Sequence, residues 1–294
     1  MALRGGRRYI LCTMKRFAIA LALLLAAAPM LALAQQTTPP RTQSPAQSAP
    51  RGAGVVRPLP PRVDLGPSAD VEYANCLARA AREPELAYED AMGWARTRGG
   101  GEPALHCAAV ALFNSGLYRQ AAQAFTDMAG RYRDRRVLIR ASLAAQAGHA
   151  WLAADDSTRA VAAFNVAVDV APDVATFWID RAEALAASRK YWEAIDDLNR
   201  AADLDPRRGD IFAFRAAAYR KVDAFDLALE DAERAVRLAP RMPEAWLERG
   251  ILRANKGDKN GARQDWRETL LLDPESPAAD AAREQIERME LGVR

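Results

Sequence analysis

The sequence predicts an all-α protein in which antiparallel helix pairs stack side by side as a solenoid. The first observation behind this prediction is a repeat of 34 residues, a length typical of two short helices with their turns. The second is a composition rich in alanine and arginine, which have high intrinsic helix propensity, whereas only 7% of residues are aromatic. The third is a proline at the same point of successive repeats, because proline ends a helix. These prolines are Pro172, Pro206, Pro240 and Pro274.

The first 34 residues have the order of features found in a signal peptide. A basic start at residues 15–16 precedes an apolar stretch over residues 17–28, and a small-x-small cleavage site ends at Ala34. The apolar stretch is shorter than the roughly 20 residues that span a bilayer, and Pro29 interrupts it. We therefore expect an exported, periplasmic protein of bacterial origin that is cleaved after Ala34 and then keeps no transmembrane segment. An uncleaved N-terminal anchor is the alternative.

The charge of the chain argues against a nucleic-acid partner. The formal net charge is +3, but the signal region holds five basic residues and no acidic one, and the rest of the chain has 36 basic against 38 acidic residues. Such a body offers no basic surface for phosphate groups.

Translation from Met1 and translation from Met14 would both produce a complete signal.

Residues 35–67 form a segment that is rich in proline, glutamine, serine, threonine and glycine. It has little apolar surface to offset the entropy lost on ordering, so we expect a disordered linker. A proline-rich ligand for another protein is the weaker interpretation.

Two cysteines, Cys76 and Cys107, remain after the signal is removed. In an oxidising compartment a pair of cysteines favours one disulfide. Two buried thiols are the alternative, and the sequence leaves both open.

Further columns keep the 34-residue step in phase with the prolines. An aromatic residue, an arginine and two small residues recur. The columns are Trp178, Phe212 and Trp246; Arg181, Arg215 and Arg249; Ala182, Ala216 and Gly250; and Ala160, Ala194, Ala228 and Ala262. Small residues let the two helices of a unit approach closely, while large residues fill the space beside them. With these columns the sequence resembles the tetratricopeptide repeat.

The resemblance implies a right-handed superhelical solenoid and divides the chain into units. Residues 102–276 would hold five repeats, and residues 68–101 a degenerate one. The five repeats are 102–135, 141–174, 175–208, 209–242 and 243–276. Residues 277–294 keep helical spacing with many charges, so we expect a capping helix there.

Arginine at position 7 of a unit occurs together with aspartate at position 23. The three pairs are Arg181 with Asp197, Arg215 with Asp231, and Arg249 with Asp265, whereas the other two repeats have alanine at both positions. These positions should lie close in antiparallel helices. We therefore expect three salt bridges within repeats, which would serve the architecture rather than a partner.

The resemblance also implies a partner-binding groove on the concave face formed by the first helices. The side chains expected there are His106, Val110, Phe113, His149, Leu152, Ile179, Glu183, Arg220, Leu247 and Ile251. The lining is mostly apolar and would suit an amphipathic helix or an apolar peptide. It lacks the lysine and asparagine with which chaperone-binding members of the family clamp a C-terminal carboxylate. The linker, the capping helix or a second copy of the chain could instead fill the groove.

Enzyme and metal signatures are missing from the sequence. It contains no GxSxG, HExxH, CxxC or Walker motif, and its only histidines are His106 and His149. A metal site would need three or four ligands, so we expect neither a metal nor a cofactor, and the two histidines either line the groove or pack. The sequence thus predicts a non-enzymatic scaffold that binds proteins or peptides of the cell envelope. A self-assembling homo-oligomeric envelope component is the alternative.

Overall fold

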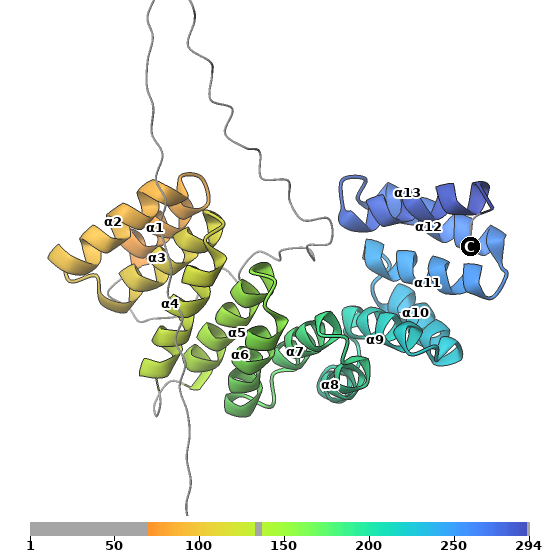
Figure 1. The fold of residues 1–294 in the computed structure, drawn as a ribbon, viewed down its shortest axis with the longest axis horizontal. Helices are drawn as coiled ribbons and strands as arrows, with labels where there is room; N and C mark the ends of the chain where they lie inside the picture. The colour runs from red at the N-terminus through yellow and green to blue at the C-terminus, as the bar shows by residue number, and fades with distance from the viewer. Residues whose placement is uncertain (1–69, 133–136, 293–294) are drawn as a thin grey trace, which may run out of the picture. The chain divides into compact units, whose positions relative to one another are not determined.

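The computed structural model describes residues 70–132 and 137–292, and this part of the chain is all-helical (Figure 1). The predicted signal peptide and linker, residues 1–34 and 35–67, lie outside the described residues. Thirteen helices occupy the described ranges. They are α1 (Asp70–Ala80), α2 (Pro84–Thr97), α3 (Gly101–Asn114), α4 (Tyr118–Arg131), α5 (Val137–Ala153), α6 (Ser157–Val170), α7 (Ala175–Ala187), α8 (Tyr191–Leu204), α9 (Gly209–Lys221), α10 (Phe225–Leu238), α11 (Pro243–Asn255), α12 (Lys259–Leu272) and α13 (Pro277–Glu290).

The helices form consecutive antiparallel pairs, as the sequence predicts (Figure 1). Each helix packs against the next one in the chain, and first helices also contact first helices, as α7 does with α5 and α9. The array is therefore held together by contacts between neighbours in sequence, which is the rule for repeat proteins. Helix α5 has 17 residues and begins four residues before the expected start of its repeat at residue 141.

The recurring prolines lie where the second helices end. Helix α6 ends at Val170 and α10 at Leu238, and Pro172 and Pro240 each follow two residues later. The carbonyls of these two prolines accept hydrogen bonds from the indole Nε1 of Trp178 (2.9 Å) and of Trp246 (2.8 Å). In these two units the indole thus fastens the beginning of the unit to the turn that precedes it.

The small residues of the first helices face large residues of the second helices, with matched sizes. A Cβ placed on Gly148 would lie 2.6 Å from the ring of Phe164, and one on Gly250 would lie 2.5 Å from Trp266 Nε1. In the unit that follows the unit of Gly148, Ala182 occupies the position of that glycine, and the smaller Leu198 occupies the position of Phe164. A smaller residue on the first helix therefore occurs with a larger one on the second helix in these units.

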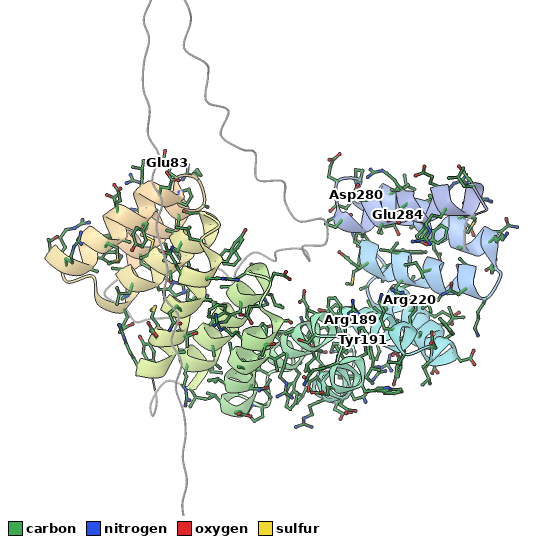
Figure 2. All side chains as sticks on the ribbon, viewed as in Figure 1. Glu83, Arg189, Tyr191, Arg220, Asp280 and Glu284 are labelled. Atoms are coloured by element: carbon green, nitrogen blue, oxygen red, sulfur yellow. A yellow bond between two sulfur atoms is a disulfide. The ribbon has the colours of Figure 1, made fainter. Side chains whose placement is uncertain are left out.

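Helix α13 is the last described helix, and it packs against α11 and α12. Ala278, Ala279 and Ala282 are buried, whereas Asp280 and Glu284 are exposed (Figure 2). The exposed charges agree with the charged helical spacing of residues 277–294 in the sequence, and the capping role of this helix stays a prediction.

Candidate functional site

The arginine and aspartate side chains that vary together in the sequence form salt bridges within their units, as predicted. Arg215 donates to both carboxylate oxygens of Asp231, at 2.7 and 2.8 Å. Arg181 binds Asp197 at 2.6 and 2.7 Å, and Arg249 binds Asp265 at 2.7 and 2.9 Å. The aspartate side chains are buried, so these pairs serve the packing and are not part of a partner-binding surface.

Two of the three arginines also reach the preceding unit. Arg181 donates from an Nη atom to Asn165 Oδ1 (3.0 Å), and Arg215 does the same to Asn199 Oδ1 (2.8 Å). The hydrogen bonds to the aspartates raise the pKa of both guanidinium groups above the ordinary arginine value. Each group therefore stays charged and joins three helices.

His106 lies inside the fold and not in an open groove, which corrects the expectation from its repeat position. It is fully buried, with Nδ1 2.8 Å from the hydroxyl of Tyr73 and Nε2 2.8 Å from Oε1 of Gln146. These bonds join α1, α3 and α5, and burial lowers the pKa of His106 to about 4. The ring is neutral at pH 7, so we assign the proton to Nε2, which donates to Gln146, while Nδ1 accepts from Tyr73.

The second histidine does not join the first. His149 Nε2 lies 3.4 Å from Oδ2 of the buried Asp180 on α7, and the imidazole meets the ring of Phe164 edge-on at 5.1 Å. The two histidines therefore take part in separate contacts on either side of α5. Within the described ranges no group of three or more His, Cys, Asp or Glu side chains could hold a metal ion.

Two more of the predicted groove residues belong to the core. Phe113 is 5% exposed and Ile179 is 1% exposed, because the neighbouring units cover them. The other predicted groove side chains are half-buried, so they can present part of their surface to a partner. They are Val110, His149, Leu152, Glu183, Arg220, Leu247 and Ile251.

Arg220 is tied to the next unit. Its Nη atom donates to Glu248 Oε2 at 3.0 Å and its Nε to Oε1 of the same buried carboxylate, which joins α9 to α11. Burial alone would lower the pKa of Arg220, but the hydrogen bonds that it donates to Glu248 raise this pKa above the ordinary arginine value. Figure 2 labels Arg220 and Tyr191, and Tyr191 on α8 also acts electrostatically on the Arg220 guanidinium.

An apolar hollow of about 220 Å³ lies among α7, α8 and α9. Its floor is made of buried side chains such as Ala194 and Leu198, and half-buried side chains such as Phe214 form its walls. Of the residues predicted from the sequence only Glu183 lines it. The sequence reasoning missed Tyr191, Phe214 and Lys221, since it considered fixed positions of the first helices only.

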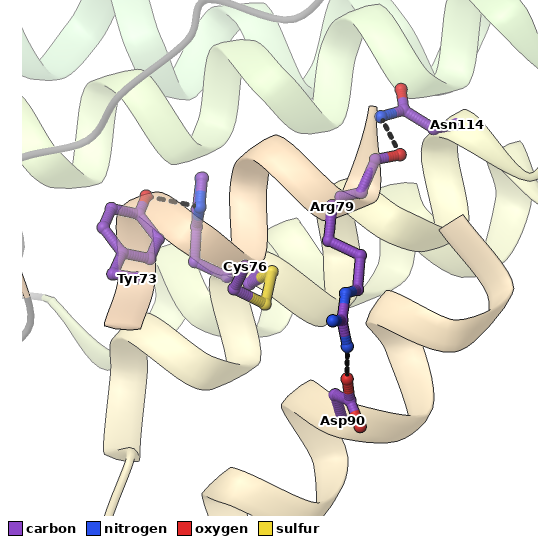
Figure 3. Close-up of a disulfide and its surroundings, with 8 residues drawn as sticks. Tyr73, Cys76, Arg79, Asp90 and Asn114 are labelled. Carbon is purple, nitrogen blue, oxygen red and sulfur yellow. Dashed lines mark hydrogen bonds and ion pairs between the residues drawn. A yellow bond between two sulfur atoms is a disulfide. The ribbon is translucent and has the colours of Figure 1, made fainter. Parts of the chain in front are cut away.

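The two cysteines form a disulfide, which settles the alternative that the sequence left open. Cys76 on α1 is bonded to the buried Cys107 on α3 across 31 positions of sequence (Figure 3). Nearby, Asn114 Nδ2 donates to the carbonyl of Ala80 at 2.9 Å, and Arg79 pairs with Asp90. The bridge thus fixes α1 to α3.

A family model described as a tetratricopeptide repeat matches residues 215–287. No curated protein matches the sequence. Among solved structures, a double mutant of MamA RS-1 is 17% identical, with a TM-score of 0.50, and the match covers 58% of this chain and 93% of that one. A MamA fragment from Desulfovibrio magneticus RS-1 is 16% identical, with a TM-score of 0.47 and coverage of 67% and 99%. The second tetratricopeptide domain of Spaghetti (RPAP3), bound to an HSP90 peptide, is 31% identical, with a TM-score of 0.33 and coverage of 34% and 92%.

Proposed function

Since the chain is a tetratricopeptide-repeat protein, we propose that it works as an exported scaffold of the cell envelope, which holds a helix or peptide of a partner protein along its first helices. Proteins of this family are typically non-enzymatic scaffolds for protein–protein interactions, so a scaffold is the starting expectation for this chain. The export and the envelope location are proposals that membership of this family does not imply.

The observation that carries the proposal is the row of first helices. Helices α5, α7, α9 and α11 each contact the next first helix in the row, and half-buried apolar side chains line them, among them Leu152, Leu247 and Ile251. In a right-handed superhelix this row would form the concave side. A partner helix laid along it would bury apolar surface at each unit, at about 25 cal/mol per Å² of apolar area removed from water.

The location rests on the sequence of residues 1–67, with a signal peptide cleaved after Ala34 and a linker over 35–67. The Cys76–Cys107 disulfide supports the same proposal, because such bonds persist mainly in oxidising compartments. Among the described helices none is both long and apolar enough to cross a membrane.

The test uses the full-length chain with a C-terminal tag in its native host. Envelope fractions are collected, the N-terminus of the mature protein is determined, and crosslinked partners are identified by mass spectrometry. We expect a mature protein that begins at Gln35 and one specific partner. Leu152→Arg should abolish the capture, and Ala162→Arg, on the exposed side of α6 in the same unit, should leave it unchanged.

Two results would contradict the proposal. A chain that stays in the cytoplasm with its leader intact would remove the envelope location. A chain that captures only itself, at every concentration tested, would replace the scaffold with the self-assembling component.

A further inference from the structure

The disulfide between Cys76 and Cys107 borders an open hollow. This hollow measures about 320 Å³ and lies between α1 and α2, and Cys76 is one of the residues that line it. Buried side chains form its floor and exposed side chains form its rim. The floor consists of Ala87, Ala91 and Trp94, and the rim of Glu72, Asn75, Arg79, Asp90 and Arg98.

The two bonded cysteines differ in their access to solvent. Cys76 is half-buried and lines the hollow, whereas Cys107 is fully buried in an apolar cluster with residues of α1, α2 and α3. A disulfide is exchanged when a thiolate attacks one of its two sulfur atoms, so the reaction depends on which sulfur can be reached. A thiol from outside therefore reaches this bond at Cys76.

The hollow has room for the attacking group. Its volume lies within the range of about 300–1,000 Å³ that is usual for pockets that bind small molecules, and a cysteine side chain with its neighbouring backbone is smaller than most such ligands. Two exposed ion pairs cross the rim from α1 to α2, Arg79 with Asp90 and Glu72 with Arg98 (Figure 3). The rim thus has two cations and two carboxylates, so charge selects no partner there, and exposed pairs of this kind hold the helices together only weakly.

Helix α1 depends on the disulfide for its attachment to α3. Apart from this bond, the hydroxyl of Tyr73 contacts His106 Nδ1 at 2.8 Å, and Asn114 Nδ2 donates to the carbonyl of Ala80 at 2.9 Å. Helix α1 is the first described helix, and it packs against α2 and α3. Cleavage of the disulfide would leave these packing contacts and hydrogen bonds to hold it.

We infer that the Cys76–Cys107 disulfide is a site of exchange with a dithiol protein, which attacks Cys76 through the hollow between α1 and α2, and that reduction loosens α1 from α3. The partner is defined by its chemistry as a protein with two neighbouring thiols. The inference goes beyond the proposed scaffold function and does not depend on it.

The exchange needs no reactant besides the dithiol. In the first step a thiolate of the partner bonds to Sγ of Cys76, the Cys76–Cys107 bond breaks, and its electron pair goes to Sγ of Cys107, which takes up a proton. In the second step the partner's other thiolate attacks the partner sulfur of the mixed disulfide, and Cys76 leaves and is protonated. The dithiol is thereby oxidised to a disulfide, and the disulfide of this chain is reduced to two thiols.

The probe for the first step is a small CxxC dithiol protein whose second cysteine is changed to serine, so that the mixed disulfide accumulates. It is mixed with the oxidised full chain, the reaction is stopped with acid, free thiols are alkylated, and the peptides are identified by mass spectrometry. We expect the probe on Cys76 and the alkyl group on Cys107. The rate should not change with urea below the unfolding transition, because the attack occurs on the folded chain.

Two matched variants test the role of the hollow. Asn75→Phe places a large side chain on the rim beside Cys76, and it should slow the formation of the mixed disulfide by about tenfold. Ala78→Phe changes an exposed residue of the same helix outside the hollow, so its rate should equal that of wild type. Circular dichroism shows whether each variant keeps its helices, and the mapping and the urea series on wild type need no variant.

The second step is tested with the intact CxxC protein and hydrogen exchange. After reduction the amides of α1 should exchange faster, while those of α9 to α12 keep their protection. Adducts divided equally between Cys76 and Cys107, or a rate that rises with urea as the unfolded population does, would overturn the inference, because the bond would then be reached only in the unfolded chain. Equal rates for Asn75→Phe and Ala78→Phe, or unchanged protection of α1 after reduction, would overturn it as well.

Discussion

The match between Gly148 and Phe164 can be tested by adding a single methyl group. In Gly148→Ala the new Cβ would lie 2.6 Å from the Phe164 ring, where ordinary contacts begin at 3.4 Å, and the ring is fully buried and cannot move into solvent. Overpacking of this kind costs about 1–3 kcal/mol, and the better helix propensity of alanine returns about 1 kcal/mol. The difference is a net loss of up to about 2 kcal/mol.

Gly93→Ala is the matched control, because Gly93 lies within α2 and a Cβ there meets no atom within 4 Å. Only the gain in helix propensity remains, so this variant should be more stable by about 0.5–1 kcal/mol. Thermal unfolding followed by circular dichroism can separate the two variants, since 1 kcal/mol shifts the midpoint by about 2–4 °C in a domain of this size.

A double-mutant cycle identifies the ring as the cause. Phe164→Leu reproduces the side chain that Leu198 presents to Ala182 in the next unit, where alanine is accommodated. On this background Gly148→Ala should keep only the gain in helix propensity, so the coupling energy equals the overpacking cost of about 1–3 kcal/mol. A loss of the same size on both backgrounds, or the same shift for Gly148→Ala and Gly93→Ala, would refute the idea that paired sizes set the helix distance.

Three other outcomes follow from the described contacts. The pKa of His106 is about 4 in the fold and near 6.5 in the unfolded chain, so the free energy of unfolding should fall as the pH drops from 6.5 toward 4, by about 1.4 kcal/mol per pH unit. Unfolding at pH 7 and pH 5 measures this loss, and His106→Gln should make the stability less dependent on pH. Reduction of Cys76–Cys107, which closes a span of 31 residues, should cost about 3–4 kcal/mol and raise hydrogen exchange in α1 and α2 but not in α9–α12. Arg215→Leu should destabilise more than the double variant with Asp231→Leu, since it leaves a buried carboxylate unpaired; equal midpoints in urea would contradict this.

The fold could be predicted from the sequence because the same spacing of helix-ending, aromatic and small residues recurs in several repeats. Proline, aromatic and small-residue columns in phase show where helices end and where they cross, and each unit contacts only its neighbours. The Arg181–Asp197 type of pair was predictable for the same reason, since arginine and aspartate occur or are missing together in each unit.

The candidate site was less predictable, because repeat position does not define burial. His106 stands at a position expected to face the groove, yet Tyr73 of the degenerate unit covers it, and Ile179 is enclosed by its neighbours. No periodic signal in the sequence indicates that His106 or Ile179 is buried.

The sequence by itself determined the helices, their pairing and the order of the units, because these depend on short-range spacing that every repeat restates. The tertiary structure alone decided that Cys76 and Cys107 are bonded, and that an apolar hollow lies among α7, α8 and α9. Both outcomes depend on how side chains of unequal size and chemistry meet across two units. The repeat pattern of the sequence does not give the distance between two side chains in neighbouring units.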